Sequence, residues 1–542
     1  MAEFDDTILR EINEARQALA RAPSNWEVWR NLGLKLWAGK QDQESLTAFG
    51  EALRLNPADA QCYAISGQIH LRFLHSEKAI EALTRAVELD PACCFAWYNL
   101  GQAHDSIGND PETEKAFSNA FRLCLARKGP LEPSDAGFVA HQKEDLGNQF
   151  EFESDPPLYL AAQKLSGFYL RQGNPERAME TLTLGLAARP DSHFLLLLAG
   201  QTLMRAGKAA EAEPLLQRFI TLKPGWAIGH RLLGGCQLEL GKSEKAIESY
   251  QRVVALNPQN IDSHFELGVA FSRLNRLVEA EASYSEALRL APEDAMCHYN
   301  LGCVQMKRKN FPAAVRLFEE AVGLNPSDPR FHHNLGISLR NLKRFVESVK
   351  ALEEAVRIQP GFDSAWRDLG VTFSSMNRFA EAFKAYRKAI EINPGKQAAY
   401  FDLGLDLVAT GNFVEALEPL GKAMENFPED LATRKELFFS AIVESRKDLA
   451  ERALEGFPIL LKSEWETPRT LSDEAKQSPL HLAVSLGSSE LVEWLISIGA
   501  PVNAVGITSP GTPLDLARRL VRKDISELLV RHGAVAILPG IV

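Results

Sequence analysis

Apolar residues recur along most of this chain at spacings of three and four, in two stretches within each period of 34 residues. Such spacing places apolar side chains on one face of an α-helix, so each period predicts two amphipathic helices. A glycine marks the same place in successive periods, in two runs: Gly33, Gly67 and Gly101, then Gly200, Gly234, Gly268, Gly302, Gly336, Gly370 and Gly404. Ser166 occupies this place one period before Gly200. Repetition at this period indicates a stacked array, in which each repeat buries its apolar face against its neighbours.

Other positions are equally regular when each repeat is numbered so that this glycine is position 8, which makes Trp26 position 1 of the first repeat. Position 4 is large, position 7 is usually leucine, position 20 is small and position 24 is large again, while a proline at position 32 ends the second helix. A glycine inside a helix costs about 1 kcal/mol relative to alanine, so a recurring one needs a packing reason. We expect the small residues at positions 8 and 20 to let the paired helices approach closely.

This combination of positions resembles the tetratricopeptide repeat (TPR) family over about residues 24–429, as eleven units. The resemblance implies an all-α fold: a right-handed superhelix of helix pairs whose first helices line a concave groove for an extended peptide or a partner helix. The third unit departs from the pattern, with Thr113 and Leu125 where alanine and proline are expected. A helix at about residues 5–21 looks like a lone second helix, so residues 1–23 are interpreted as a capping segment.

The glycine register slips once, because one of the two intervals between Gly101 and Ser166 is 31 residues instead of 34. The extra stretch, 127–157, is rich in proline, glycine and acidic residues, which favours an inserted loop or hinge. It separates units 1–3 at 24–126 from units 4–11 at 158–429.

A second repeat type follows at residues 430–542. Ser478-Pro479-Leu480-His481 and Thr512-Pro513-Leu514-Asp515 are 34 residues apart, and each leads to a matching Gly-Ala end. These segments resemble ankyrin repeats, and residues 437–461 resemble a degenerate first one. About three repeats are therefore predicted, forming a short solenoid that ends in an apolar tail at 534–542.

Composition narrows the class of partner. The net charge of −11 argues against nucleic acid, no segment is apolar enough to span a membrane, and no secretory signal is found, so we expect a cytoplasmic protein. Seven cysteines in 542 residues do not form a disulfide framework, and buried free thiols are expected.

A search for catalytic chemistry gives no candidate: catalytic residues, cofactor and metal are all predicted to be absent. Position 4 holds His230, His264, His298 and His332, but equivalent positions on successive repeats lie roughly 8–10 Å apart, too far to share one metal ion. These histidines occupy the place that tryptophan or tyrosine fills elsewhere, which indicates packing.

Binding is therefore assigned to the predicted groove and to a protein or peptide partner. Asparagines at position 6 could grip a peptide backbone, as in the similar ladder of O-linked N-acetylglucosamine transferase, and exposed aromatic and basic residues are frequent interface anchors. The candidates are Asn31, Asn99, Asn300, Asn334, Tyr98, Phe265, Tyr299, His333, Arg367, Phe401, Arg205, Arg273, Lys307 and Arg340. If the basic members face the groove, an acidic peptide is favoured.

The leading hypothesis is a non-enzymatic scaffold or adaptor, with the groove as one interaction surface and the ankyrin repeats as a second. Two alternatives stay open: a substrate-targeting component of an O-GlcNAc-transferase-like glycosylation system, and a bacterial effector acting on host proteins.

Overall fold

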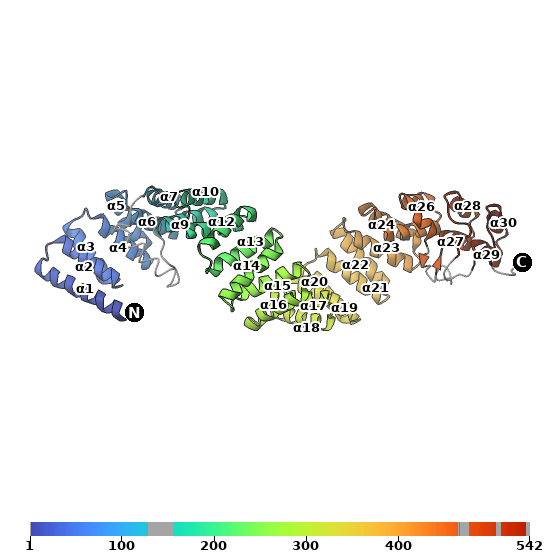
Figure 1. The fold of residues 1–542 in the computed structure, drawn as a ribbon, viewed down its shortest axis with the longest axis horizontal. Coiled ribbons are helices and arrows are strands. Elements are labelled where there is room, and N and C mark those ends of the chain that lie inside the picture. Colours follow the sequence, from blue (N-terminus) through green and yellow to red (C-terminus); the bar gives the residue numbers. More distant parts are fainter. Residues whose placement is uncertain (1, 128–155, 464, 467–475, 506–510, 538–542) are drawn as a thin grey trace. The chain divides into compact units, whose positions relative to one another are not determined.

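The computed structural model describes residues 2–127, 156–463, 465–466, 476–505 and 511–537. The chain divides into two compact units, Met1–Asn275 and Arg276–Val542, which are treated separately below as the N-terminal and C-terminal units. Both are built from helices that follow one another in pairs (Figure 1), which confirms the expected all-α class. Nearly all of the predicted insertion at 127–157, and the end of the predicted apolar tail, lie outside the described residues.

The described part of the N-terminal unit is entirely helical. A single helix precedes the first pair, and the helices in chain order are α1 (Ala2–Arg21), α2 (Trp26–Ala38), α3 (Asp42–Leu55), α4 (Ala60–Arg72), α5 (Ser76–Leu89), α6 (Cys94–Ser106), α7 (Asp110–Ala126), α9 (Pro156–Arg171), α10 (Pro175–Ala188), α11 (His193–Arg205), α12 (Ala209–Leu222), α13 (Ala227–Glu239), α14 (Ser243–Leu256) and α15 (Ile261–Arg273).

The C-terminal unit begins with helices of the same lengths and continues with shorter ones. The longer helices are α16 (Leu277–Leu290), α17 (Ala295–Lys307), α18 (Phe311–Leu324), α19 (Pro329–Asn341), α20 (Phe345–Ile358), α21 (Asp363–Ser375), α22 (Phe379–Ile392), α23 (Gln397–Ala409), α24 (Phe413–Asn426) and α25 (Leu431–Val443). The shorter elements are α26 (Lys447–Leu454), the 3₁₀ helix η2 (Pro458–Lys462), α27 (Pro479–Leu486), α28 (Ser489–Ser497), α29 (Pro513–Arg519) and α30 (Lys523–Arg531). Between η2 and α27, the two-residue strands β1 (Trp465–Glu466) and β2 (Lys476–Gln477) pair in antiparallel fashion.

The recurring glycine is explained by a close approach between the two helices of a repeat. A Cβ on Gly336 would lie 2.6 Å from Cγ of Leu352, and one on Gly234 would lie 2.8 Å from the Tyr250 ring. The atom that needs the space therefore belongs to position 24. Position 20 contributes in another way, since the Ser348 hydroxyl donates a hydrogen bond of 2.7 Å to the Gly336 carbonyl. The expected close packing is confirmed, with position 24 as the main contact.

One backbone conformation forms the turn between the helices of each pair. Position 15 has a positive φ throughout, whether it is glycine, as in Gly207 at +70°, or a residue with a side chain, as in Lys343 at +60°. A left-handed residue after a helix lets amide groups reach the last free carbonyls, and glycine adopts it without a steric penalty. Ser445, which follows α25, obeys the same rule with φ of +56°.

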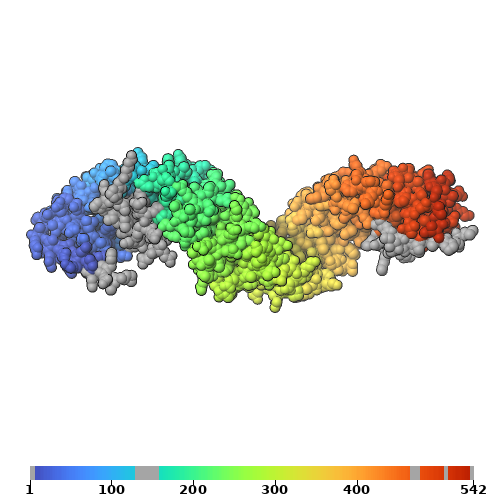
Figure 2. Space-filling view, in the orientation of Figure 1, coloured from blue at the N-terminus to red at the C-terminus, as the bar shows by residue number. Residues whose placement is uncertain are grey.

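Helix α25 joins the two repeat types through a shared core. One cluster of buried apolar residues runs from Val349 to Ala534, and it includes Phe438 and Phe439 of α25. Trp465 is 2% exposed, and its indole ring stacks on the ring of Phe439 with 5.2 Å between the ring centroids. In Figure 2 the orange atoms of the last long helices continue without a break into the red atoms of the short ones. The shorter repeats are therefore packed onto the longer ones as one body.

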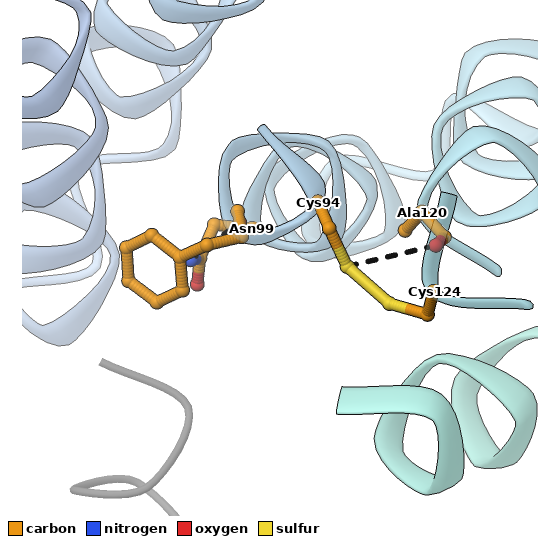
Figure 3. The surroundings of a disulfide bond; sticks show 5 residues. Cys94, Asn99, Ala120 and Cys124 are labelled. Carbon is orange, nitrogen blue, oxygen red and sulfur yellow. Dashed lines mark hydrogen bonds between the residues drawn. A yellow bond between two sulfur atoms is a disulfide. The ribbon is translucent and has the colours of Figure 1, made fainter. Parts of the chain in front are cut away.

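The prediction that all cysteines are free thiols is wrong for two of them. Cys94, the first residue of α6, is disulfide-bonded to Cys124 near the end of α7 (Figure 3). The two helices of the pair run in opposite directions, which brings the start of one beside the end of the next, with a Cα–Cα distance of 6.4 Å. Cys62, Cys236 and Cys297 are free thiols and are buried, as expected.

Candidate binding surface

The first helices of successive repeats contact one another and present positions 5 and 6 on a common face, here called the first-helix face. In the C-terminal unit it is formed by α17, α19, α21 and α23. A regular set of hydrogen bonds links position 5 of one repeat to position 6 of the next. Asn334 Nδ2 donates to Tyr299 Oη at 3.1 Å. His333 Nε2 lies 2.8 Å from Asp368 Oδ2, and Arg367 Nε donates to Asp402 Oδ2 at 2.6 Å.

The carboxylates of this face were not among the predicted site residues, although they alternate with the predicted basic ones. Asp368 also accepts from Arg340 at 3.0 Å. Burial would raise the pKa of Asp368, but the hydrogen bond from His333 and the charge of Arg340 outweigh it, so its pKa lies below the ordinary value. Burial raises the pKa of Asp402 despite Arg367. Burial also raises the pKa of Asp406, which accepts hydrogen bonds from the hydroxyl groups of Ser374 and Tyr386.

Asn300 differs from the other members of this row. Its side chain is partly exposed, and it makes no hydrogen bond to another described residue, so both its donor and its acceptor can serve a ligand. Lys307, on the same helix, is exposed and has no ion-pair partner within the described residues. Further along the face, Phe401 lines a cleft of about 520 Å³ together with Ala398, Phe427 and Pro428.

The predicted residues of the N-terminal unit do not form one continuous row. Asn31 is exposed, whereas Tyr98 and Asn99 are buried, with Asn99 Nδ2 donating to the carbonyl of Phe95 (Figure 3). Phe265 on α15 is partly exposed. The role of these residues in binding stays a prediction.

The basic candidates differ in how far their charge is already neutralised. Arg340 and Arg367 are paired with Asp368 and Asp402. Arg273 donates to the backbone carbonyl of Leu238 at 2.5 Å. Lys307 and Arg205 are exposed and have no ion pair with another described residue. A backbone carbonyl does not neutralise a guanidinium charge, so any attraction for an acidic peptide depends mostly on Arg273, Lys307 and Arg205.

The histidines at position 4 have a structural role that the sequence analysis did not identify. His230, His298 and His332 each place Nε2 at 2.9–3.0 Å from the carbonyl of the proline six residues earlier. Trp366 does the same with its indole N–H. A ring N–H is what these residue types share, so tryptophan and histidine can replace each other at this place. The signal was present in the sequence as the constant interval of six residues from proline to the ring.

Arg434 occupies the same position 4 in α25 and extends this pattern. Arg434 is 7% exposed, and its guanidinium group donates to the carbonyls of Pro428, Arg452, Ala453 and Glu455. The bond to Pro428 repeats the contact between position 4 and the proline six residues earlier. The other three bonds are made to carbonyls at the C-terminal end of α26. This residue could have been recognised only by aligning α25 with the preceding repeats.

Tetratricopeptide repeat models match residues 12–60, 60–93, 169–295, 299–361 and 364–396, which is more than half of the chain. The chain belongs to the tetratricopeptide repeat family. An ankyrin repeat model matches residues 476–507, which confirms the second repeat type.

Curated relatives of this TPR protein match it over limited stretches. Tetratricopeptide repeat protein 33 of Xenopus laevis is 32% identical over 141 residues, which cover 23% of this chain and 54% of the relative. The human protein O-mannosyl-transferase TMTC3 is 24% identical over 241 residues, covering 42% of this chain and 26% of that protein. The chain thus spans about half of the first relative's length and about a quarter of the second's.

Solved structures with the same kind of repeat align with part of the chain. YrrB, described as a TPR protein with an unusual peptide-binding site, aligns with 34% of this chain at 23% identity, covers 95% of its own length and has a TM-score of 0.31. A chain of the APC/C hetero-tetramer Cut9-Hcn1 aligns with 84% of this chain at 12% identity, with 94% of its own length covered and a TM-score of 0.38.

Among the residues that the structure describes, no group of three or more His, Cys, Asp or Glu side chains is arranged to hold a metal ion. None of the described helices combines the length and the apolar character that crossing a bilayer requires.

Proposed function

We propose that this TPR protein is a non-enzymatic scaffold or adaptor that binds an extended peptide or a partner helix on its first-helix face. Membership of the family supports interaction with proteins in general. In this proposal residues 24–429 form the main binding array, 1–23 cap it, 127–157 interrupt it, and the ankyrin repeats of 430–542 offer a second surface.

The observation that carries the proposal is the unpaired amide of Asn300 beside a row of hydrogen-bonded neighbours. An amide offers one acceptor and two donors, which matches the alternating C=O and N–H groups of an extended backbone. Lys307 lies on the same helix and suits a carboxylate on the ligand. Phe401, at the cleft near α23 and α24, suits an apolar side chain.

Site-specific photo-crosslinking tests this assignment directly. A benzophenone amino acid is placed in the full chain at Asn300, at Phe401, or at Glu320 on α18 as a matched exposed control. We expect a protein crosslinked from native lysate at the first two positions, absent with Glu320, and competed away by the unmodified chain. Equal crosslinking at all three positions, or none at Asn300 and Phe401, would contradict the proposal.

A second candidate function is suggested by the relative named as an O-mannosyl-transferase. Here the same surface would present protein substrates to a separate glycosylating enzyme. Incubating the purified chain with a sugar donor and its crosslinked partner separates the cases: sugar transfer by the chain alone contradicts a non-enzymatic role. Transfer only after a second enzyme is added favours the targeting function over a simple scaffold.

A further inference from the structure

The turn that joins α29 to α30 exposes basic and apolar side chains together. It is here called the α29–α30 turn, and its residues, all exposed, are Arg518, Arg519, Leu520, Val521, Arg522 and Lys523. Asp524 is the only acidic residue in 518–524. The side chains of Arg518, Arg522 and Lys523 form no ion pair with another described residue. The turn therefore presents a positive charge that the rest of the described chain does not neutralise.

The equivalent turns of the two preceding ankyrin repeats differ from it. After α25, Arg446 is paired with Asp448 at 2.7 Å, and Lys447 with Glu490 at 2.6 Å. After α27, residues 486–489 include no charged side chain. Unneutralised positive charge is thus found at one of the three turns, although all three belong to the same short array.

Val521 has an unfavourable backbone conformation at the centre of this turn. Its φ is +55°, whereas the residue one period earlier is Gly487, with φ of +76°. A left-handed backbone crowds the Cβ atom, and β-branched residues rarely adopt it. The side chain is nevertheless 74% exposed, so packing within the fold does not compensate for the strain. Strain of this kind is typical of functional sites, which indicates a contact with a partner.

We propose that the α29–α30 turn binds the surface of a membrane that contains anionic phospholipids. Each cation close to such a surface strengthens binding about fivefold. Leu520 and Val521 would enter the boundary between headgroups and acyl chains. The long stems of arginine and lysine let their charges stay at the level of the phosphates while the apolar side chains go deeper.

The shape of the turn favours a lipid surface over an acidic protein. A turn at the end of a helix pair projects outward, so a folded partner would need a pocket of matching shape to cover Val521. A fluid bilayer adapts to a projecting group, and it offers phosphates and hydrocarbon in the order that the basic and apolar side chains require.

Co-sedimentation of the full chain with sucrose-loaded vesicles tests the proposal. One set of vesicles contains phosphatidylcholine with about a quarter phosphatidylserine, and the other contains phosphatidylcholine alone. We expect binding to the first set, at least about tenfold weaker binding to the second, and weaker binding to the first at high salt. Equal binding to both sets, or binding to neither, would overturn the proposal.

Val521→Gly separates a role in binding from a role in the fold. Glycine suits the left-handed conformation, so the midpoint of thermal unfolding should rise while vesicle binding weakens about fivefold. Leu74→Gly is the matched control: Leu74 also has a positive φ, +59°, and is 87% exposed, but the nearby Arg72 is paired with Asp42. That variant should also become more stable and should bind vesicles unchanged. Undiminished vesicle binding by Val521→Gly would contradict the proposal.

Substitutions of single cations test the contribution of charge. Arg518→Gln and Lys523→Gln should each weaken binding to the anionic vesicles about fivefold. Arg446→Gln removes the same charge from the first ankyrin turn, where it is already paired, and should change little. An equal loss in Arg446→Gln would contradict the assigned place.

Fluorescent poly-L-glutamate serves as a probe for the alternative partner. If the chain binds this polymer but no vesicles, and Val521→Gly leaves polymer binding intact, the turn recognises an acidic protein and the proposal is wrong. These substitutions lie outside the first-helix face, so their outcome is independent of crosslinking at Asn300.

Discussion

In the C-terminal unit, positions 5 and 6 of successive first helices are joined by hydrogen bonds, as between His333 and Asp368 or Arg367 and Asp402. In the N-terminal unit, α11 and α13 place partly exposed Leu198 and Leu232 at position 6 instead. Both sets of helices have the same length and the same turn. The repeat therefore needs positions 4, 8, 15 and 24 for its fold, and it leaves positions 5 and 6 free to be polar or apolar.

The largest expected difference between the units is redox dependence, because the described disulfide lies in the N-terminal unit. Its sequence separation of 30 residues corresponds to about 3–4 kcal/mol of stabilisation in the chain-entropy model. Reduction should therefore lower the protection of α6 and α7 from hydrogen exchange and leave α17–α23 unchanged.

Quantitative alkylation of the protein taken directly from its native source provides the control. Disulfides persist mainly in oxidising compartments, whereas a cytoplasmic location was expected. Seven alkylated cysteines before reduction would contradict a Cys94–Cys124 bond in the cell.

Removing one carboxylate should affect the C-terminal unit more than removing one leucine affects the N-terminal unit. Asp368→Ala leaves His333 and Arg340 partly buried without a partner, at an expected cost of about 3 kcal/mol. Leu232→Ala removes a partly exposed side chain and should cost about 1–2 kcal/mol. Urea unfolding measures both, and an equal or reversed order would show that the polar row adds no stability.

Substitutions at position 4 should lower the stability of both units by a similar amount. His332→Phe and His230→Phe each remove the ring nitrogen that bonds to a proline carbonyl, so each should cost about 1 kcal/mol. The corresponding tryptophan variants keep an N–H and should lose less. A tryptophan variant as unstable as its phenylalanine counterpart would contradict the hydrogen-bond explanation.

The smallest effects should appear in the pH dependence of two neighbouring carboxylates. The pKa of folded Asp368 is lowered, so its stabilisation is present above the ordinary pKa of aspartate and is lost as the pH falls through the folded value. The pKa of folded Asp406 is raised, so stability increases as the pH falls through the folded value and is fully gained below the ordinary pKa of aspartate.

Replacing either carboxylate by an amide should remove its own pH dependence. Asp406→Asn should leave the midpoint of thermal unfolding at pH 7 unchanged or slightly higher, whereas Asp368→Asn should lower it. Midpoints measured from pH 7 down to pH 4 check both statements. A loss of stability at pH 7 in Asp406→Asn as large as that in Asp368→Asn would contradict the assigned directions.

The sequence predicted the helix pairs, the glycine contact and the two repeat types because each depends on spacing along one chain. It did not predict the hydrogen bonds from position 5 to position 6. These bonds join residues that are 35 apart in the sequence, and they can be predicted only when the packing angle between successive repeats is known. The disulfide was missed for the same reason: Cys94 and Cys124 meet only when α6 and α7 pack in opposite directions.

Helix α25 begins in the manner of a TPR helix, with Arg434 bonded to the carbonyl of Pro428, and it ends inside the core of the ankyrin repeats. The two repeat types therefore cannot be exchanged as independent cassettes. An expression fragment cut at residue 429 would expose Leu420 and Met424 on one side and Phe438 and Phe439 on the other. Fragment boundaries, gene fusions and binding studies on isolated parts should keep α24 to α27 together.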